Sequence, residues 1–236
     1  MNGWDESAAA WIRSMGERGD WSREWVLDPA MLPHIQDRGF GAALDVGCGE
    51  GRFCRLMRQA GIEAVGIDPT AALIEEARRR DPSGRYEIGR AEELPFERGQ
   101  FDLVVTYLSL IDIPDFRAAV AEMNRVLKPD GTLLVANLAS FVTAGSGTGW
   151  VRDAEGRRSY FPVDRYLEEY PQAVSWAGIA IVNWHRPLSA YMTALLDAGL
   201  ILRTFEEPSA VGGDPERAAF QRRVPWFVVM EWRKLA

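Results

Sequence analysis

Residues 42–51 read AALDVGCGEG, a short apolar run that stops at three closely spaced glycines. The run predicts a buried strand, and the apolar positions Phe53, Leu56, Met57 and Ala60 that follow have helical spacing. A strand, a glycine-rich turn and a helix bring a ligand against backbone N–H groups at the helix N-terminus. Taken alone, the pattern is equally consistent with a tight turn that binds no ligand.

A second predicted strand near 64–67 ends at Asp68. An acidic residue at this place accepts hydrogen bonds from ribose hydroxyl groups, in NAD as in any adenosine-containing cofactor. The dinucleotide fingerprint requires a third glycine where this chain has Arg52. Asp45, just before the turn, would repel a pyrophosphate but suits an ammonium group. The pattern therefore favours a ligand with a cationic amino-acid end and a ribose end.

Five segments in this order resemble the class I S-adenosylmethionine-dependent methyltransferases of the small-molecule type. They are LDVGCGEG (44–51), VGIDPT (65–70), RAEELPF (90–96), FDLVVTYLSLIDIPD (101–115) and EMNRVLKPDGTLLVAN (122–137). The resemblance covers about residues 40–138, with weaker matches at 185–207. It implies an α/β fold with a doubly wound, mostly parallel seven-stranded sheet of order 3-2-1-4-5-7-6, strand 7 being antiparallel. It also implies S-adenosyl-L-methionine as cofactor and S-adenosyl-L-homocysteine as product.

The resemblance further implies which residues contact each part of the cofactor. For the methionine end they are Asp45, the backbone of Gly47, Cys48 and Gly49, and Arg23 as a partner for the carboxylate. For the ribose and adenine they are Asp68, Pro69, Thr70, Ala91 and Glu92. Those beside the sulfonium are Tyr107 and Leu108. Arg90 stands where relatives often have Asp, and because an arginine cannot accept from the adenine amino group, Glu92 or water takes that contact. Two alternatives remain open: Tyr107 is an ordinary packed aromatic residue, and Arg23 forms a solvated ion pair.

Methyl transfer needs an aligned nucleophile, exclusion of water and, for O–H or N–H acceptors, removal of a proton. His185 is the candidate base, because it follows a predicted strand at the head of a predicted helix and its ordinary pKa suits the task. Tyr107, beside the sulfonium, is the second candidate catalytic residue. The alternative for His185 is a structural histidine that braces the helix. His34 is expected to be structural or exposed, and Asp115 is expected to cap the next helix.

The composition limits the class of protein. The chain has 236 residues, 47% of them hydrophobic, and a formal net charge of −7, which disfavours a nucleic-acid partner. Its two cysteines give no disulfide framework, and we see no signal peptide, no apolar run of about 20 residues and no metal-ligand spacing. We therefore expect a cytoplasmic protein without a metal or membrane partner. The sequence does not indicate an oligomeric state.

The chain is predicted to have two parts. Residues 1–39 form a helical lid that contains Trp4, Trp11, Trp21 and Trp25, the alternative being helices packed outside the sheet. Residues 40–236 form the methyltransferase domain, with a substrate-binding insertion at 140–184 whose aromatic residues favour a flat apolar acceptor, unless they are the insertion's own core.

Alternating strands and helices from 40 to 138 predict right-handed βαβ units. Beyond them we expect a loop and hairpin within 142–165, one strand from Ser175 to Trp184, a helix at 187–198 and strands at 200–205 and 226–232. The function indicated is transfer of a methyl group to an O, N or C nucleophile of a small, aromatic or apolar molecule. The alternatives are an NAD-type oxidoreductase and a non-catalytic S-adenosylmethionine-binding protein.

Overall fold

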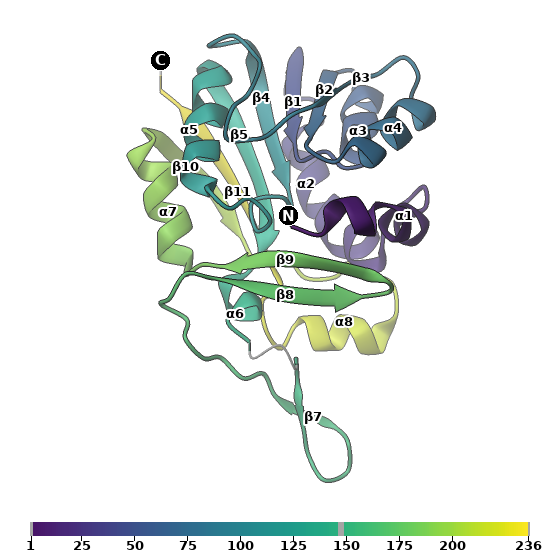
Figure 1. Ribbon diagram of the computed structural model, residues 1–236. Coiled ribbons are helices and arrows are strands. Elements are labelled where there is room, and N and C mark those ends of the chain that lie inside the picture. Colours follow the sequence, from purple (N-terminus) through teal and green to yellow (C-terminus); the bar gives the residue numbers. More distant parts are fainter. Residues whose placement is uncertain (1, 146–148, 236) are drawn as a thin grey trace.

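The computed structural model describes residues 2–145 and 149–235, which form a seven-stranded sheet with helices on both faces (Figure 1). The strands are β1 (Ala42–Val46), β2 (Glu63–Asp68), β3 (Arg85–Ile88), β4 (Phe101–Tyr107), β5 (Leu127–Leu138), β10 (Leu200–Glu206) and β11 (Phe227–Lys234). Their order is β3-β2-β1-β4-β5-β11-β10, and β11 is antiparallel to both neighbours. With β10 and β11 as the sixth and seventh strands of the sheet, this is the predicted order.

Two helical layers cover the sheet. The helices are α3 (Arg52–Gln59), α4 (Ala71–Arg80), α5 (Phe116–Val126) and α7 (Leu188–Asp197). Because successive strand residues point to opposite faces, Leu133 and Val135 of β5 join the core under α5 and α7. Leu134 and Ala136 join the other core, under α3 and α4. Both faces are therefore buried, as in a doubly wound fold.

The N-terminal residues form several short helical elements, as predicted for 1–39. They are α1 (Trp4–Met15), the π-helical turn η1 (Arg23–Leu27), α2 (Asp28–Met31) and the 3₁₀ turn η2 (Leu32–His34). Leu27 and Met31 are buried against the sheet core. Helix α1 instead lies near the ends of the strands, where the Ser7 hydroxyl donates to the carbonyl oxygen of Ala180 at 3.0 Å (Figure 1). The segment thus has one part on a sheet face and one beside the strand ends.

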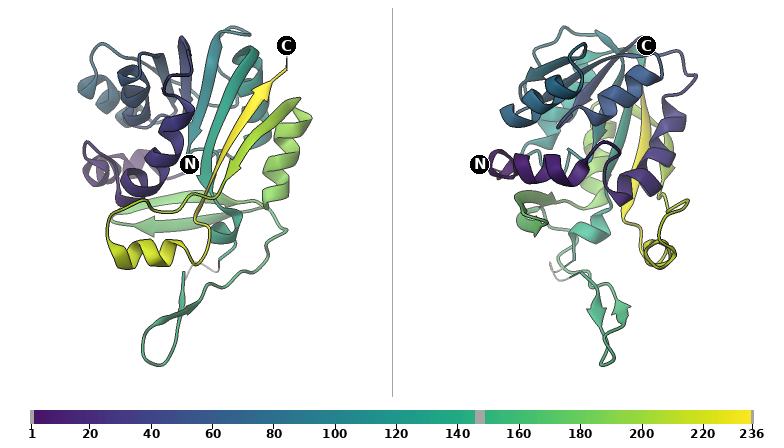
Figure 2. Two further views of the ribbon diagram at one scale, coloured as in Figure 1. Left: turned by 180° about the vertical axis from the view of Figure 1, so that it is seen from behind. Right: turned by 90° about the vertical axis from the view of Figure 1, so that its right-hand side faces the viewer.

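The region between β5 and α7 contains two small hairpins and a short helix, α6 (Ser140–Thr143). Strands β6 (Val151–Arg152) and β7 (Arg158–Tyr160) form a hairpin that projects from the body (Figures 1 and 2). Residues 146–148 of the predicted insertion lie outside the described residues.

The predicted single strand from Ser175 to Trp184 is wrong. It is part of an antiparallel pair, β8 (Tyr170–Trp176) and β9 (Ile179–His185). The chain reverses at Ala177 and Gly178, which have φ of 48° and 82°. Two successive left-handed residues make the tight turn typical of a hairpin, and an alanine at the first position hides that signal in the sequence.

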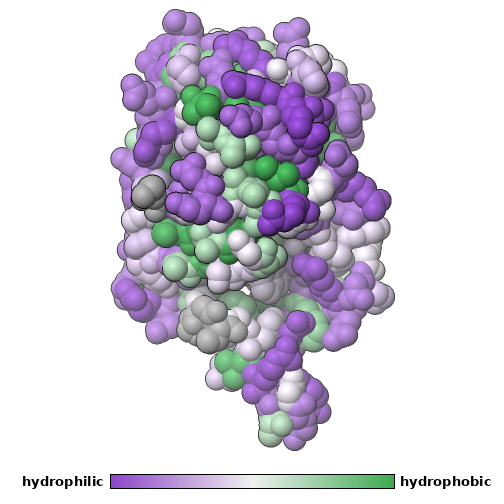
Figure 3. Space-filling view, turned by 45° about the vertical axis from the view of Figure 1, so that its right-hand side comes forward, coloured by the Kyte–Doolittle hydropathy of each residue, from purple (hydrophilic) through white to green (hydrophobic). Residues whose placement is uncertain are grey.

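A further helix, α8 (Pro215–Gln221), begins after Asp214, whose side chain accepts from the backbone N–H of Arg217 at 2.8 Å. This helix was not predicted from the sequence. None of the helices within 2–145 and 149–235 combines the length and the apolar character needed to cross a membrane. On the face drawn in Figure 3, hydrophobic residues gather in the middle and hydrophilic residues surround them.

Candidate cofactor and substrate site

A cavity of about 460 Å³ lies where β1, β2 and β4 end. In a parallel sheet this edge is where ligands bind, because the strands' carboxyl ends and the following helix N-termini meet there. The lining combines residues of the predicted cofactor site with residues of α1 and β9, among them Trp4, Trp11 and Trp184. One cavity therefore joins the expected cofactor region to an aromatic wall from distant parts of the chain.

The glycines of the turn after β1 are required by their surroundings. Gly47 has φ of 77°, and a Cβ built there would lie 2.4 Å from the Cβ of Ser109. Gly51 has φ of 75°, and its Cβ would lie 2.5 Å from the ring of Tyr86. An L side chain is strained at such φ values and sterically blocked at both positions. The turn can therefore pack closely against Ser109, just after β4, and against Tyr86 of β3, while Gly47 and Gly49 line the cavity.

The N–H groups of this turn point toward β2. Those of Gly47 and Cys48 donate to the carbonyl oxygen of Ile67 at 2.8 and 3.1 Å, and that of Gly49 donates to Oδ2 of Asp68 at 3.0 Å. Cys48 is buried and does not line the cavity. These N–H groups are therefore engaged within the protein, and Gly47 and Gly49 line the cavity next to Trp11, whose Nε1 would lie 3.7 Å from a Cβ at Gly49.

Asp68 lies at the tip of β2 and lines the cavity, as expected for a ribose partner. Its Oδ1 accepts from the backbone N–H of Thr70 at 2.8 Å, and its Oδ2 accepts from Gly49. Burial raises the pKa of Asp68, while the two backbone hydrogen bonds lower it. Each carboxylate oxygen has a second lone pair, so the side chain is fixed in place yet can still accept from hydroxyl groups.

Asp45 is buried behind the turn rather than in the cavity wall. Its Oδ2 accepts from the Cys54 thiol at 3.5 Å, and its Oδ1 has no hydrogen-bond partner among the described residues. Burial raises the pKa of this carboxyl group to about 7. Asp45 thus does not line the cavity, and its carboxyl group is neutral below about pH 7.

The residues predicted for the adenine lie together on the cavity wall. They are Pro69, Thr70, Ala91 and Glu92. Arg90 is beside them and donates from Nη2 to Oε1 of Glu92 at 3.0 Å. Arg90 is thus paired with Glu92, the acidic residue expected to replace the Asp that relatives often have at position 90.

Tyr107 and Leu108 also line the cavity. The Tyr107 hydroxyl, however, donates to Oδ1 of Asp28 at 2.9 Å, and Asp28 in turn pairs with Arg52. Burial raises the pKa of Tyr107 well above its ordinary value. The ring can border a ligand, but the hydroxyl faces a carboxylate, which disagrees with Tyr107 as an acid–base residue. Leu108 has φ of 58°, a strained conformation of the kind found at binding sites.

Arg23 lines the cavity near the N-terminal helix. Its Nη1 lies 3.0 Å from Oδ2 of Asp20, and its guanidinium lies 4.9 Å from the ring centre of Trp11. The Arg23 side chain is buried, whereas that of Asp20 is 38% exposed, so the pair lies at the edge of the cavity and is partly solvated.

His185, the candidate base, does not line the cavity and its exposed fraction is 0%. Its Nε2 donates to the backbone carbonyl of Tyr166 at 2.9 Å, and its Nδ1 lies 2.7 Å from the Thr143 hydroxyl. Burial lowers its pKa, which favours the neutral ring. With both nitrogens engaged, the ring has the geometry of the structural alternative, a brace between β9 and α6, and not that of a base.

The other predicted polar residues have structural positions. His34 lies between Glu231 and Glu206, with ring nitrogens 2.7 and 3.0 Å from their carboxylates. Asp115 accepts from the Ala118 N–H at 3.0 Å and caps α5, as expected.

Two acidic residues of the cavity, Asp5 and Asp112, were not predicted from the sequence. Asp112, in the loop between β4 and α5, lines it and accepts from Nε1 of Trp4 at 3.2 Å. Its position among residues that read as a turn gave no sign of this role, and its indole partner is remote in the sequence.

Comparison with known proteins agrees with this geometry. The model of a methyltransferase domain family matches residues 44–135. A solved S-adenosylmethionine-dependent methyltransferase from Mesorhizobium loti is 27% identical, with a TM-score of 0.77 over 93% of this chain and 100% of that one. Residues 44–135 therefore match a methyltransferase domain, and the fold is similar to that of a solved S-adenosylmethionine-dependent methyltransferase. This similarity implies S-adenosyl-L-methionine as the cofactor.

Curated relatives match about half of this chain. The malonyl-(acyl-carrier protein) O-methyltransferase of Enterobacter lignolyticus is 34% identical over 47% of this chain and 44% of that protein. The demethylmenaquinone methyltransferase of Renibacterium salmoninarum is 31% identical over 54% of this chain and 52% of that protein. The chain thus spans about half the length of the curated relatives it matches. Because the matches omit the rest of each protein, they do not carry a substrate over to this chain.

Proposed function

We propose that this protein transfers the methyl group of S-adenosyl-L-methionine to an O, N or C nucleophile of a small aromatic or apolar molecule, with S-adenosyl-L-homocysteine as the product. The observation that supports this most directly is that one cavity is lined both by Asp68 and the glycine turn and by Trp4, Trp11 and Trp184. Its volume of about 460 Å³ is typical of small-molecule sites.

Within this proposal, the cofactor contacts follow the predicted residues. Asp68 accepts from the ribose hydroxyls, Ala91 and Glu92 border the adenine, and Arg23 pairs with the carboxylate. The carbonyl groups of the turn, with Asp45 behind them, take the ammonium. When bound, the cofactor supplies a methyl carbon activated by a sulfonium. The chain's own residues orient the acceptor against it and exclude water, which accounts for much of the rate in such reactions.

The acceptor side of the proposal rests on the aromatic wall. Trp4 and Trp11 meet edge to face with ring centres 5.1 Å apart, and both line the cavity. Aromatic walls with few polar groups favour flat, apolar ligands. A nucleic-acid acceptor is disfavoured by the net charge of −7. The cytoplasm remains the expected location.

We also propose that α1 acts as a lid and that the methyltransferase domain is residues 40–236. Trp11 supports the lid, because its Nε1 donates to Oε2 of Glu50 in the glycine turn at 2.7 Å. Cofactor bound beside the glycine turn would thus contact α1, which this hydrogen bond attaches to the rest of the protein.

The test is label transfer from methyl-tritiated S-adenosyl-L-methionine to a panel of phenols, quinols, aromatic amines and aliphatic controls. We expect label in an organic product for at least one aromatic acceptor and none for the aliphatic controls. Cofactor binding without transfer to any acceptor would favour a non-catalytic binding protein. Binding of NAD instead would favour the oxidoreductase.

A further inference from the structure

Asp112 carries a buried carboxylate oxygen for which the described residues offer no partner. Its Oδ2 accepts from the Trp4 indole, whereas its Oδ1 is inaccessible to solvent and has no hydrogen-bond partner among residues 2–145 and 149–235. Leaving such an atom unpaired is costly, and functional sites are where proteins tolerate this cost. Because Asp112 lines the cavity, a ligand group that reaches its carboxylate can supply the partner that Oδ1 lacks.

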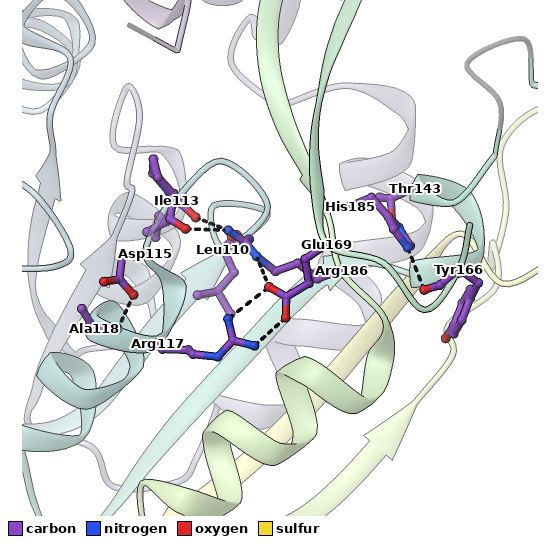
Figure 4. A network of polar contacts seen from close by, with 11 residues as sticks. Leu110, Ile113, Asp115, Arg117, Ala118, Thr143, Tyr166, Glu169, His185 and Arg186 are labelled. Carbon is purple, nitrogen blue, oxygen red and sulfur yellow. Dashed lines mark hydrogen bonds and ion pairs between the residues drawn. The ribbon is translucent and has the colours of Figure 1, made fainter. Parts of the chain in front are cut away.

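Arg186 holds the loop that carries Asp112. Its Nη1 donates to the carbonyl oxygen of Leu110 at 3.1 Å, and its Nη2 donates to those of Ile113 and Pro114 at 2.7 and 2.9 Å (Figure 4). These carbonyl groups lie on both sides of Asp112 in the chain. The planar guanidinium, with an exposed fraction of 1%, makes this a rigid anchor.

Arg186 is itself fixed from the opposite side. Its guanidinium lies 4.5 Å from the ring centre of Phe116, and its Nε lies 3.8 Å from Glu169. Glu169 also pairs with Arg117 of α5 (Figure 4). These contacts hold the loop, and with it Asp112, in a fixed position, which an acid–base group requires.

Several charged groups face the Asp112 carboxylate. Its pKa is raised to about 8, chiefly by burial and to a smaller extent by the negative charge of Asp68. The Trp4 hydrogen bond and the positive charges of Arg186 and Arg23 act in the opposite direction. The group thus titrates near neutral pH, where a proton acceptor is most effective.

We propose that Asp112 is the proton acceptor of the site, so that the methyl acceptor carries a transferable N–H or O–H proton. This inference rests on the proposed function. The acceptor's nitrogen or oxygen forms a bond to the methyl carbon, and the carbon–sulfur bond breaks with its electron pair staying on sulfur. The acceptor's proton moves to Oδ1 of Asp112, which changes from carboxylate to carboxylic acid. Charge and atoms balance, because one positive sulfonium and one negative carboxylate become neutral together.

The inference narrows the acceptor to amines, phenols and related hydroxyl compounds. A carboxylate acceptor brings no proton to remove, and its charge would face that of Asp112. Trp4 and Arg186 are positioning residues in this scheme, since they act on the acceptor only through Asp112.

The first test measures the protons released when the cofactor binds, and it requires no methyl acceptor. S-adenosyl-L-methionine and S-adenosyl-L-homocysteine are titrated calorimetrically at pH 8 in phosphate and in Tris, whose ionisation enthalpies differ. The sulfonium favours the charged form of a nearby carboxyl group. We therefore expect the wild type to release a larger fraction of a proton on binding S-adenosyl-L-methionine than on binding S-adenosyl-L-homocysteine. Asp112→Asn should lose this excess. An equal excess in both proteins would overturn the inference.

The control variants separate this effect from damage to the fold. Asp115→Asn changes a neighbouring exposed carboxyl group to another good helix cap and should keep the full excess. Trp4→Phe removes a hydrogen bond that stabilises the charged form, so the pH midpoint of the excess should move upward. An unchanged midpoint in a folded Trp4→Phe variant would contradict the assignment to Asp112.

The second test measures transfer to 2-phenylethylamine, 4-ethylphenol and 3-phenylpropanoate. We expect the amine or the phenol to be methylated, and Asp112→Asn to lower kcat about 100-fold or more with cofactor affinity within about twofold. Methylation of the carboxylate alone, or full activity in the variant, would overturn the inference. Failure of the wild type to bind the cofactor would instead count against the proposed function.

Discussion

The Trp4 indole donates a 3.2 Å hydrogen bond to Asp112, a residue 108 positions further along the chain. The bond joins the first turn of α1 to the loop between β4 and α5, and both residues line the cavity. The N-terminal helix and the catalytic edge of the sheet therefore share one wall, and a change in either affects the other.

The glycine turn gives a prediction about stability. Gly47→Ala places a Cβ 2.4 Å from that of Ser109, at a φ of 77°. Gly61→Ala is the matched control, because Gly61 has φ of 82° and no atom within 4 Å of the added Cβ. We expect the control to lose about 1 kcal/mol of unfolding free energy. Gly47→Ala should lose about 1–3 kcal/mol more, because of overpacking.

Urea unfolding of both variants measures the two losses. Calorimetric titration with S-adenosyl-L-homocysteine should then show weakened binding for Gly47→Ala alone. Equal losses of stability would show that the contact with Ser109 is not what requires this glycine.

Asp45 predicts a dependence of stability on pH. Burial raises its pKa in the folded protein from 3.8 to about 7, so between these values the folded state binds more protons than the unfolded state. The contribution of Asp45 to stability is therefore complete below about pH 4 and is lost as the pH rises toward 7. Asp45→Asn lacks this loss. As the pH rises, its free energy of unfolding should therefore increase relative to that of the wild type, by at most about 1.4 kcal/mol per pH unit.

Unfolding free energies of the two proteins, measured from pH 4.5 to 7.5, test this. A difference between them that stays constant over the range would contradict the buried, protonated carboxyl group.

The position of His185 predicts a structural phenotype. His185→Phe leaves the Thr143 hydroxyl and the Tyr166 carbonyl without their ring partners, which should cost about 1–3 kcal/mol of unfolding free energy. Affinity for S-adenosyl-L-homocysteine should stay within about twofold, and the pH profile of transfer should not move. A variant of normal stability that has lost transfer would restore His185 as the base.

The lid proposal predicts local protection from hydrogen exchange. Amides of α1 (Trp4–Met15) should exchange more slowly with S-adenosyl-L-homocysteine bound, because the ligand would lie against Trp4 and Trp11. Helix α7 (Leu188–Asp197), packed on a sheet face, serves as the internal control. Equal changes in both helices, or none in α1, would argue against a lid.

The sequence was sufficient for the fold because its signals are local. The glycine turn, Asp68 and the alternating apolar runs each specify a neighbouring element, and the sheet order follows from the family resemblance. The β8–β9 hairpin was missed because its turn begins at Ala177, a residue without a turn preference.

The acid–base residues could not be predicted in the same way. His185 has the right chemistry, but only packing decides that both ring nitrogens are engaged. Asp112 became a candidate only when the structure placed Trp4 and Arg186 around its loop. Such contacts join segments far apart in the chain, and no local pattern records them.

The cofactor site is tested most directly by calorimetric titration of the wild type and Asp68→Ala with S-adenosyl-L-methionine, S-adenosyl-L-homocysteine and NAD. We predict that the wild type binds the two adenosyl ligands in the micromolar range and does not bind NAD. Asp68→Ala should bind them far more weakly while remaining folded, because the ribose hydroxyls lose their acceptor. Folded, ligand-free wild type that binds neither adenosyl ligand would contradict the account, and so would an Asp68→Ala variant of unchanged affinity.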